Sequence, residues 1–281
     1  RAPGVPRHDM LQLLRLAGWM TVSNVVGPVM VYMDRFFIGA RLGLSDVTFY
    51  TTPYDVVTRL SVIPMGIVGV LFPAFSSLVA TEPERAGRLY ARSWNVILGV
   101  MGPVLLAVFA FAPEGLALWL DDEFATRSSG VLRWLAVGVL LNSLARVPFV
   151  LIQGAGRPMM TALVHLVELP LYLSALVWLL AHRGIEGVAM AWTARVALDL
   201  VVFAILGRRL LPHHARSDRT ILLPLVAVGG LFVVASLLDA PVPRAALVVA
   251  TGLGCITWLV RSVVGPDLLR SLLRRTADRH G

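Results

Sequence analysis

About eight long apolar runs, separated by short polar connections, constrain what this chain can fold into. We place the runs at residues 14–38, 52–79, 93–112, 131–153, 160–181, 187–207, 221–238 and 246–264. A helix needs roughly 20 apolar residues to cross a bilayer, and only helices or closed barrels satisfy their backbone groups there. The sequence therefore predicts an all-α, polytopic membrane helix bundle. Between the third and fourth runs, residues 113–130 predict a short interfacial helix followed by an acidic turn.

The composition agrees with a membrane protein and excludes several other classes. Of the 281 residues 57% are hydrophobic and 15% are charged, whereas an ordinary soluble domain is about 25% charged. All 25 Lys+Arg positions are arginine, so this chain has no lysine for a Walker A motif or a Schiff base. The single cysteine, Cys255, has no second cysteine for a disulfide or a structural zinc site. We predict neither a cofactor nor a metal.

The arginines lie mainly in the connections, where positive charge orients membrane helices. One side of the predicted membrane carries Arg1, Arg7, Arg15, Arg85, Arg88, Arg92, Arg157, Arg208, Arg209, Arg216, Arg219, Arg270, Arg274, Arg275 and Arg279. The other side carries Arg35, Arg41, Arg127, Arg183 and Arg244, together with the acidic residues Asp121, Asp122 and Glu123. The imbalance of about three to one predicts that both termini are cytoplasmic. It also explains the net charge of +8 by membrane topology, without nucleic-acid binding.

Ionisable residues inside the apolar runs are candidates for a functional site, because each is costly in lipid unless it faces a cavity or a partner. The second run contains Asp55 and Arg59, and the sixth contains Arg195 and Asp199, each pair four residues apart. Such spacing puts both side chains on one helix face. We expect a shared polar interior surface, although each pair is equally compatible with a structural ion pair that contacts no substrate.

Three further ionisable residues belong to the same candidate surface. Arg146 stands alone in the fourth run, and the fifth run carries His165 and Glu168 three residues apart. The His165 and Glu168 spacing could ligate a metal. Because the sequence indicates no further cluster of His, Cys or carboxylate groups at that depth, we favour a hydrogen-bonded pair.

Asp34 and Arg35 are adjacent near the far end of the first run. Neighbouring residues of a helix point about 100° apart, so the two side chains face different surroundings. We expect Arg35 to extend to the outer headgroups. We expect Asp34 to turn inward, towards Asp55 and Arg59 of the next helix.

The order of several motifs resembles the second half of Wzx-type polysaccharide flippases, in the multidrug/oligosaccharidyl-lipid/polysaccharide superfamily. In those flippases an Asp-Arg pair ends a helix, a Tyr-containing turn follows, and the next helix closes on a Phe-Pro-x-hydrophobic-Ser motif. The matching positions here are Asp34, Arg35, Tyr50, Phe72, Pro73 and Ser76. The segments "WLDDEFATRSSGVLRWLAVG", "GAGRPMMTALVHLVELPLYL" and "RGIEGVAMAWTARVALD" are similar to later family motifs. The resemblance extends over residues 12–212.

The resemblance implies two six-helix bundles around a central cavity, sometimes followed by two extra helices. This chain would then contain a cytoplasmic linker at residues 1–13, a six-helix bundle at 14–212, two additional transmembrane helices at 213–265 and a cytoplasmic basic tail at 266–281. The first bundle would be missing, so the sequence would be a fragment or a partner would supply the rest.

The implied function is transport, not catalysis: a flippase that moves lipid-linked oligosaccharide across the bacterial plasma membrane for lipopolysaccharide or exopolysaccharide biosynthesis. The implied partners are a lipid-linked pyrophosphate oligosaccharide, membrane lipids, a polysaccharide polymerase and glycosyltransferases, and no nucleic acid. Because arginine matches phosphate oxygens with a planar set of donors, we predict anion contacts at Arg59, Arg146 and Arg195. Ion coupling or pairing is assigned to Asp34, Asp55, His165, Glu168 and Asp199.

Two alternatives remain. A multidrug or cation extruder of the same superfamily would share the fold, but its cavity would favour acidic and aromatic residues. An integral-membrane transferase acting on lipid-linked sugars would need paired carboxylates or a metal motif, for which "DDEF" at 121–124 is the candidate. The position of this segment in an acidic outer turn favours a solvated loop.

Overall fold

The computed structural model describes residues 7–212 and 218–261, and the elements within those ranges are helices and turns, with no strand. The helices are α1 (Arg7–Arg41), α2 (Leu44–Arg59), α3 (Val62–Thr81), α4 (Pro83–Ala110), α5 (Ala112–Trp119), α6 (Asp122–Gly154), α7 (Pro158–Arg209), α8 (Asp218–Leu237) and α9 (Pro241–Leu259). Five of them, α3, α4, α6, α7 and α9, are long and apolar enough to cross a membrane. The predicted all-α membrane helix bundle is confirmed.

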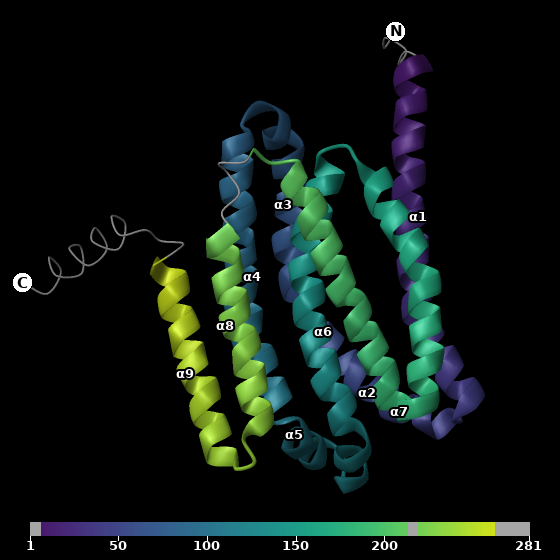
Figure 1. The fold of residues 1–281 in the computed structure, drawn as a ribbon, viewed down its shortest axis with the longest axis vertical. Helices are drawn as coiled ribbons and strands as arrows, with labels where there is room; N and C mark the ends of the chain where they lie inside the picture. The colour runs from purple at the N-terminus through teal and green to yellow at the C-terminus, as the bar shows by residue number, and fades with distance from the viewer. Residues whose placement is uncertain (1–6, 213–217, 262–281) are drawn as a thin grey trace, which may run out of the picture.

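The longest helical segment, α7, is a hairpin of two helices. Gly184 interrupts it with φ 57° and ψ −142°, a left-handed conformation that glycine adopts without the steric penalty of a Cβ atom. The two arms correspond to the predicted runs 160–181 and 187–207. In Figure 1 they run back along one another from the turn at the lower edge of the bundle. This hairpin brings residues of two separate predicted spans into one site.

The predicted run 52–79 is not one helix, and this boundary prediction is wrong. The helix breaks between Arg59 and Val62, so that α2 and α3 are separate elements. Pro64 explains the break, because proline has no N–H with which to continue the hydrogen-bond ladder to the carbonyl group of Leu60. Because of this break, α2 is not continuous with α3 and packs against α1 and α6.

The short helix expected between the third and fourth runs is α5, and α6 follows it after the acidic turn. The Asp121 side chain caps α6 by accepting a hydrogen bond from the backbone N–H of Phe124 at 2.8 Å. A side-chain oxygen at this position satisfies one of the free N–H groups at a helix start. At least part of the acidic cluster therefore has a structural role.

Helix α6 forms the centre of the bundle and packs against α2, α3, α4, α5 and both arms of α7. The approach of the second arm of α7 is close because Gly138 leaves room for the ring of Trp192. On the other side, α8 and α9 pack against α4. Gly99 of α4 meets Leu259 of α9, and Gly102 of α4 meets Val228 of α8. Small residues of α4 thus allow α8 and α9 to pack closely against it.

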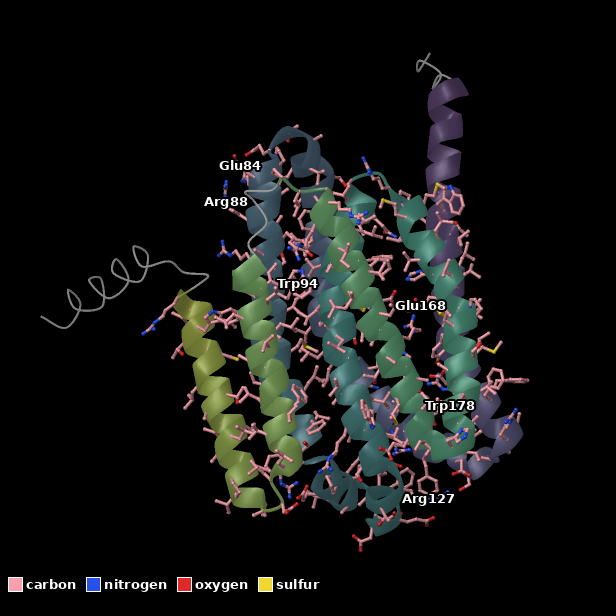
Figure 2. The ribbon with its side chains drawn as sticks, in the orientation of Figure 1. Glu84, Arg88, Trp94, Arg127, Glu168 and Trp178 are labelled. Carbon is pink, nitrogen blue, oxygen red and sulfur yellow. The ribbon has the colours of Figure 1, made fainter. Side chains whose placement is uncertain are left out.

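The arginines of the two sets that the structure describes lie at opposite ends of the bundle. Figure 2 shows Arg88 at one end, beside the start of α4, and Arg127 at the other, beside the start of α6. Which end faces the cytoplasm stays a prediction, as does the division into linker, six-helix bundle, extra helices and tail. The structure begins α1 at Arg7, inside the predicted linker, and residues 1–6, 213–217 and 262–281 lie outside its description.

Candidate functional site

A cavity of about 450 Å³ lies between α1, α6 and α7. Its volume is in the range usual for small-ligand sites. Two of the three predicted anion contacts, Arg146 of α6 and Arg195 of α7, line it. The other residues with polar side-chain groups that line it are Asn24, Tyr32, Asn142, His165 and Asp199. The cavity therefore combines residues of the first, fourth, fifth and sixth predicted spans.

The hairpin of α7 brings two pairs together that the sequence keeps apart. His165 and Glu168 on its first arm face Arg195 and Asp199 on its second arm. The Nη1 atom of Arg195 is 3.5 Å from Asp199 Oδ2 and 3.8 Å from Glu168 Oε2, and His165 Nε2 is 3.8 Å from Asp199 Oδ1. We call these four residues the hairpin cluster. Figure 2 shows Glu168 between the two arms. The shared polar interior surface predicted for these residues is present.

Several polar atoms of the cavity lining and of the hairpin cluster have no hydrogen-bond partner among the described residues, although they are buried. They are Arg146 Nε, Arg195 Nε, His165 Nδ1, Asp199 Oδ1 and both carboxylate oxygens of Glu168. Buried polar groups in proteins are otherwise nearly always hydrogen-bonded, because leaving them unpaired is costly. This concentration of unpaired donors and acceptors marks the cavity as a place for a polar ligand, an ion or water.

The hairpin cluster also contains a group with metal-ligand spacing. One potential ligand atom each of His165, Glu168 and Asp199 lies within 4.8 Å of the other two. The expectation of no further carboxylate at the depth of His165 and Glu168 is wrong, because the hairpin returns Asp199 to that depth. The guanidinium of Arg195, however, already lies beside both carboxylates. Any cation bound here would compete with that arginine for the same charge.

Asp34 is fully buried and turns inward, as expected, but its partners differ from the expected ones. Its carboxylate accepts a hydrogen bond from Tyr50 Oη of α2 at 2.7 Å and another from Tyr172 Oη of α7. Three helices are joined at this carboxylate. Asp55 and Arg59 do not contact it, because the Asp34 face of α1 meets α7 and the start of α2. No periodic signal in the sequence relates Asp34 to Tyr172, which lies 138 residues further along the chain.

The predicted pairing of Asp55 with Arg59 is absent from the described structure. Asp55 instead accepts a hydrogen bond from Arg35 Nη2 at 2.8 Å, and the Arg35 guanidinium lies 5.0 Å from the centre of the Tyr54 ring. Arg35 therefore has an ion-pair partner on α2, and its expected contact with the outer headgroups stays a prediction. Arg59 is the last residue of α2, is exposed, and does not line the cavity. The break after α2 separates it from the cavity residues.

The roles assigned to all eight candidate residues stay predictions, but their placement is now defined. The cavity is lined by Arg146, Arg195, Asp199 and His165. Glu168 does not line the cavity but contacts Arg195, which does. Asp34 lies buried beside the same helices, whereas Asp55 and Arg59 are exposed on α2. Sequence reasoning missed Tyr50 and Tyr172 as partners of Asp34, and the polar residues Asn24 and Asn142.

Comparison with known proteins gives consistent matches. Residues 3–79 match the family model described as "Polysaccharide biosynthesis protein". The chain is 34% identical over 191 residues to "Putative O-antigen transporter" of Shigella flexneri, a match that covers 68% of this chain and 45% of that protein. It is 24% identical over 193 residues to "Probable low-salt glycan biosynthesis flippase Agl15" of Haloferax volcanii, covering 68% of this chain and 41% of that protein. The chain spans less than half the length of these curated relatives.

Proposed function

Since the chain belongs to the family of Wzx-type polysaccharide flippases, we propose that it moves a lipid-linked oligosaccharide, the repeat unit of a polysaccharide, across the bacterial plasma membrane. The names of its relatives, an O-antigen transporter and a glycan biosynthesis flippase, support this proposal. The cavity between α1, α6 and α7 is the substrate site in this proposal. Both termini of the chain are cytoplasmic in it.

The observation that carries the proposal is the pair of guanidinium groups in one cavity. Arg146 and Arg195 both line it, and each keeps an unpaired Nε donor within the described structure. The substrate carries a pyrophosphate, whose oxygens match the planar donor set of arginine. Asn24 and Asn142 offer neutral donors and acceptors that suit sugar hydroxyl groups.

The hairpin cluster supplies a physical means of coupling substrate binding to an ion. Arg195 lies between two carboxylates, Glu168 and Asp199, and faces the cavity. When a substrate anion draws Arg195 towards the cavity, the carboxylates lose their counterion and gain affinity for a proton or a metal cation. His165, beside Asp199, is a further acceptor for that proton. The coupling ion is therefore released or bound as Arg195 exchanges partners.

The proposal includes a second half of the transporter. The matched relatives are more than twice as long as the segment that they share with this chain. We propose that six further helices, in the same polypeptide or in a partner, close the cavity opposite α1 and α7. A polysaccharide polymerase and glycosyltransferases would act on the same lipid-linked substrate.

The two alternatives differ in what they require of named residues. A cation extruder would need a net negative cavity, whereas the lining here contains two arginines, Arg146 and Arg195, and one acidic residue, Asp199. A transferase would use the "DDEF" segment, but Asp121 caps α6 and Glu123 is engaged by Arg127 at 3.3 Å. Arg127 also holds Asp46 of α2 at 2.7 Å. These contacts support a structural role for the segment.

Reconstitution tests the proposal directly. The full-length protein is placed in proteoliposomes with a fluorescent lipid-linked oligosaccharide, and a membrane-impermeant quencher measures how much label crosses the bilayer. We expect transbilayer movement of the glycolipid and none of a cationic dye. Movement of the dye without movement of the glycolipid would establish the extruder alternative and overturn the proposal.

A further inference from the structure

A groove lies between α6 and α8, apart from the cavity between α1, α6 and α7. Its volume is about 470 Å³. One wall is a face of α6 with the helical spacing Gly130, Arg133, Trp134, Val137, Leu140 and Leu141. The other is a face of α8 formed by Leu225, Gly229, Phe232, Val233 and Ser236. From Gly130 to Leu141 the groove extends about 16 Å along the helix axis.

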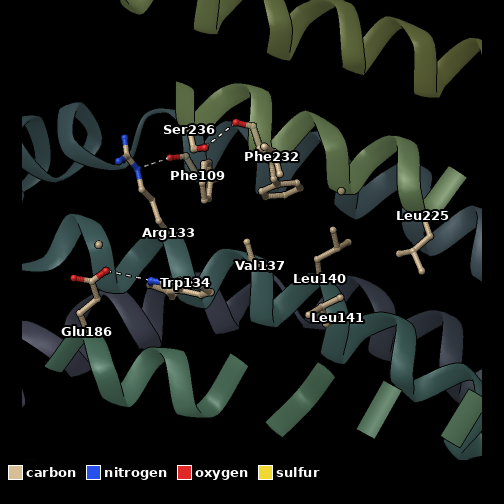
Figure 3. Close-up of a pocket in the computed structure, with 13 residues that line it drawn as sticks. Phe109, Arg133, Trp134, Val137, Leu140, Leu141, Glu186, Leu225, Phe232 and Ser236 are labelled. Carbon is tan, nitrogen blue, oxygen red and sulfur yellow. Dashed lines mark hydrogen bonds between the residues drawn. The ribbon is translucent and has the colours of Figure 1, made fainter. Parts of the chain in front are cut away.

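The groove changes in character along its length (Figure 3). Arg133, Trp134 and Ser236 lie at one end, with Glu186 beside Trp134, and Leu140, Leu141 and Leu225 lie towards the other. The polar end is on the side of the bundle where α6 begins and α8 ends. The arginine distribution predicts that this is the outer side. An amphipathic ligand would match this gradient, with its headgroup at the membrane surface and its chain in the hydrocarbon core.

The polar end holds one group of each sign, and the two do not neutralise each other. Arg133 Nε donates to the carbonyl oxygen of Phe109 at 3.3 Å, and no other hydrogen bond or ion pair of its guanidinium is found within residues 7–212 and 218–261. Glu186 Oε1 accepts from Trp134 Nε1 at 3.1 Å and likewise lacks a cation within salt-bridge distance in those ranges. The Arg133 guanidinium also lies 5.6 Å from the centre of the Phe109 ring. A cation and an anion at the same end of one groove, without an ion pair between them, complement a zwitterion.

We propose that this groove binds a zwitterionic membrane phospholipid with an amine-bearing headgroup, of the phosphatidylethanolamine type. The phosphate pairs with Arg133, the ammonium group pairs with Glu186, and an acyl chain follows Val137, Leu140 and Leu225. Glu186 argues against the pyrophosphate of a glycan carrier, because a carboxylate would repel two phosphate groups. The lipid contacts both α6 and α8, and so fastens α8 to the bundle. The inference stands independently of the proposed transport function.

Gly229 offers a direct test, because it lines the groove and an added Cβ atom meets nothing within 4 Å. Gly229→Leu should fill the groove without disturbing α8. Gly230→Leu is the matched control, since Gly230 is also exposed and open but does not line the groove. Any loss of folding caused by leucine in α8 would appear in both variants.

The experiment is native mass spectrometry of the full-length protein with phosphatidylethanolamine, phosphatidylglycerol and a polyprenyl pyrophosphate as competing probes. We expect one retained phosphatidylethanolamine, an occupancy about tenfold lower in Gly229→Leu, and no change in Gly230→Leu. Glu186→Gln keeps an acceptor for Trp134 and should abolish the preference for phosphatidylethanolamine over phosphatidylglycerol. Equal retention of phosphatidylglycerol by the unmodified protein, preferential retention of the pyrophosphate, or identical behaviour of the two glycine variants would each overturn the proposal.

Discussion

Arg195 reaches across the hairpin of α7 to Glu168, with 3.8 Å between its Nη1 atom and Glu168 Oε2. The two residues are 27 positions apart and belong to different predicted spans, yet their side chains are 8% and 2% exposed. The contact joins the first arm of the hairpin to the second inside the membrane. It also links the cavity to a carboxylate that does not line it. Substitutions here should therefore affect both stability and transport.

Replacing Arg195 with alanine should abolish polysaccharide export and destabilise the protein. Removal of one partner from a buried ion pair typically costs about 3–5 kcal/mol, because the remaining charges lose their compensation. Export is measured by complementation of a strain that lacks the transporter, and stability by thermal unfolding in detergent. Arg88→Ala, which removes a guanidinium from an exposed position at the end of the bundle, is the control and should retain both properties.

Arg146→Ala should separate the two effects. Arg146 has no ion pair in the described part of the chain, so its removal leaves no carboxylate uncompensated. We expect export to fall at least tenfold, about 1.4 kcal/mol, with little change in the unfolding temperature. Arg59→Ala should keep export near the unmodified level, because Arg59 lies outside the cavity. Loss of export in Arg59→Ala and its retention in Arg146→Ala would reverse our assignment.

Asp34→Ala should destabilise the junction of α1, α2 and α7. The carboxylate accepts hydrogen bonds from Tyr50 and Tyr172, and its removal leaves two buried hydroxyl groups without an acceptor. Each unsatisfied buried group costs about 1–3 kcal/mol. Tyr50→Phe, which removes one donor while keeping the ring, should cost less than Asp34→Ala. Thermal unfolding of the two single variants and the double variant measures the coupling, and additive effects would contradict the contact.

Gly138→Ala should loosen the packing of α6 against the second arm of α7. A Cβ atom at this position would overlap with the ring of Trp192, which has no room to withdraw because it is 2% exposed. Overpacking of this kind costs about 1–3 kcal/mol. Gly115→Ala is the matched control, since an added Cβ atom meets nothing within 4 Å there. Both variants are compared by unfolding temperature and by the yield of monodisperse protein.

Asp121→Ala should reduce stability without affecting export. Loss of a side-chain N-cap costs about 1 kcal/mol, because the N–H group of Phe124 at the start of α6 loses its acceptor. Asp122→Ala, which removes the neighbouring carboxylate but no cap, should be neutral in both assays. Sugar-transfer activity of the purified protein that disappears in these variants would instead support the transferase alternative.

Most of the helices could be predicted from the sequence, because the bilayer sets a minimum length for an apolar helical span. The runs at 93–112, 131–153 and 221–238 all became helices near their predicted places. The short helix before Asp121 was predicted as an interfacial amphipathic helix followed by an acidic turn. The prediction of a single helix at 52–79 was wrong. It rested on the apolar composition of the run, which does not show that Pro64 interrupts the hydrogen bonds of the preceding turn.

The candidate site was predictable as a set of residues but not as a set of contacts. Charged groups are expensive in lipid, so Asp34, Arg146, His165, Glu168, Arg195 and Asp199 could be recognised individually from the sequence. The rule that residues four apart on a helix are neighbours predicted the ion pair of Arg195 with Asp199 correctly. The same rule predicted a pair of Asp55 with Arg59, which is wrong, because the rule considers only residues of one helix. Arg35 proved the nearer partner of Asp55, from a helix that the rule does not consider.

The sequence by itself determined that this chain is a helical membrane protein of the polysaccharide flippase family, and which charged residues lie inside its spans. These properties follow from local composition and from the order of motifs along the chain. Only the tertiary structure decided that the hairpin at Gly184 brings together the hairpin cluster of His165, Glu168, Arg195 and Asp199. It also decided that Tyr172 donates a hydrogen bond to Asp34. The physical reason is that such contacts depend on how the helices rotate and pack against one another, and close packing between distant segments leaves no periodic trace in the sequence.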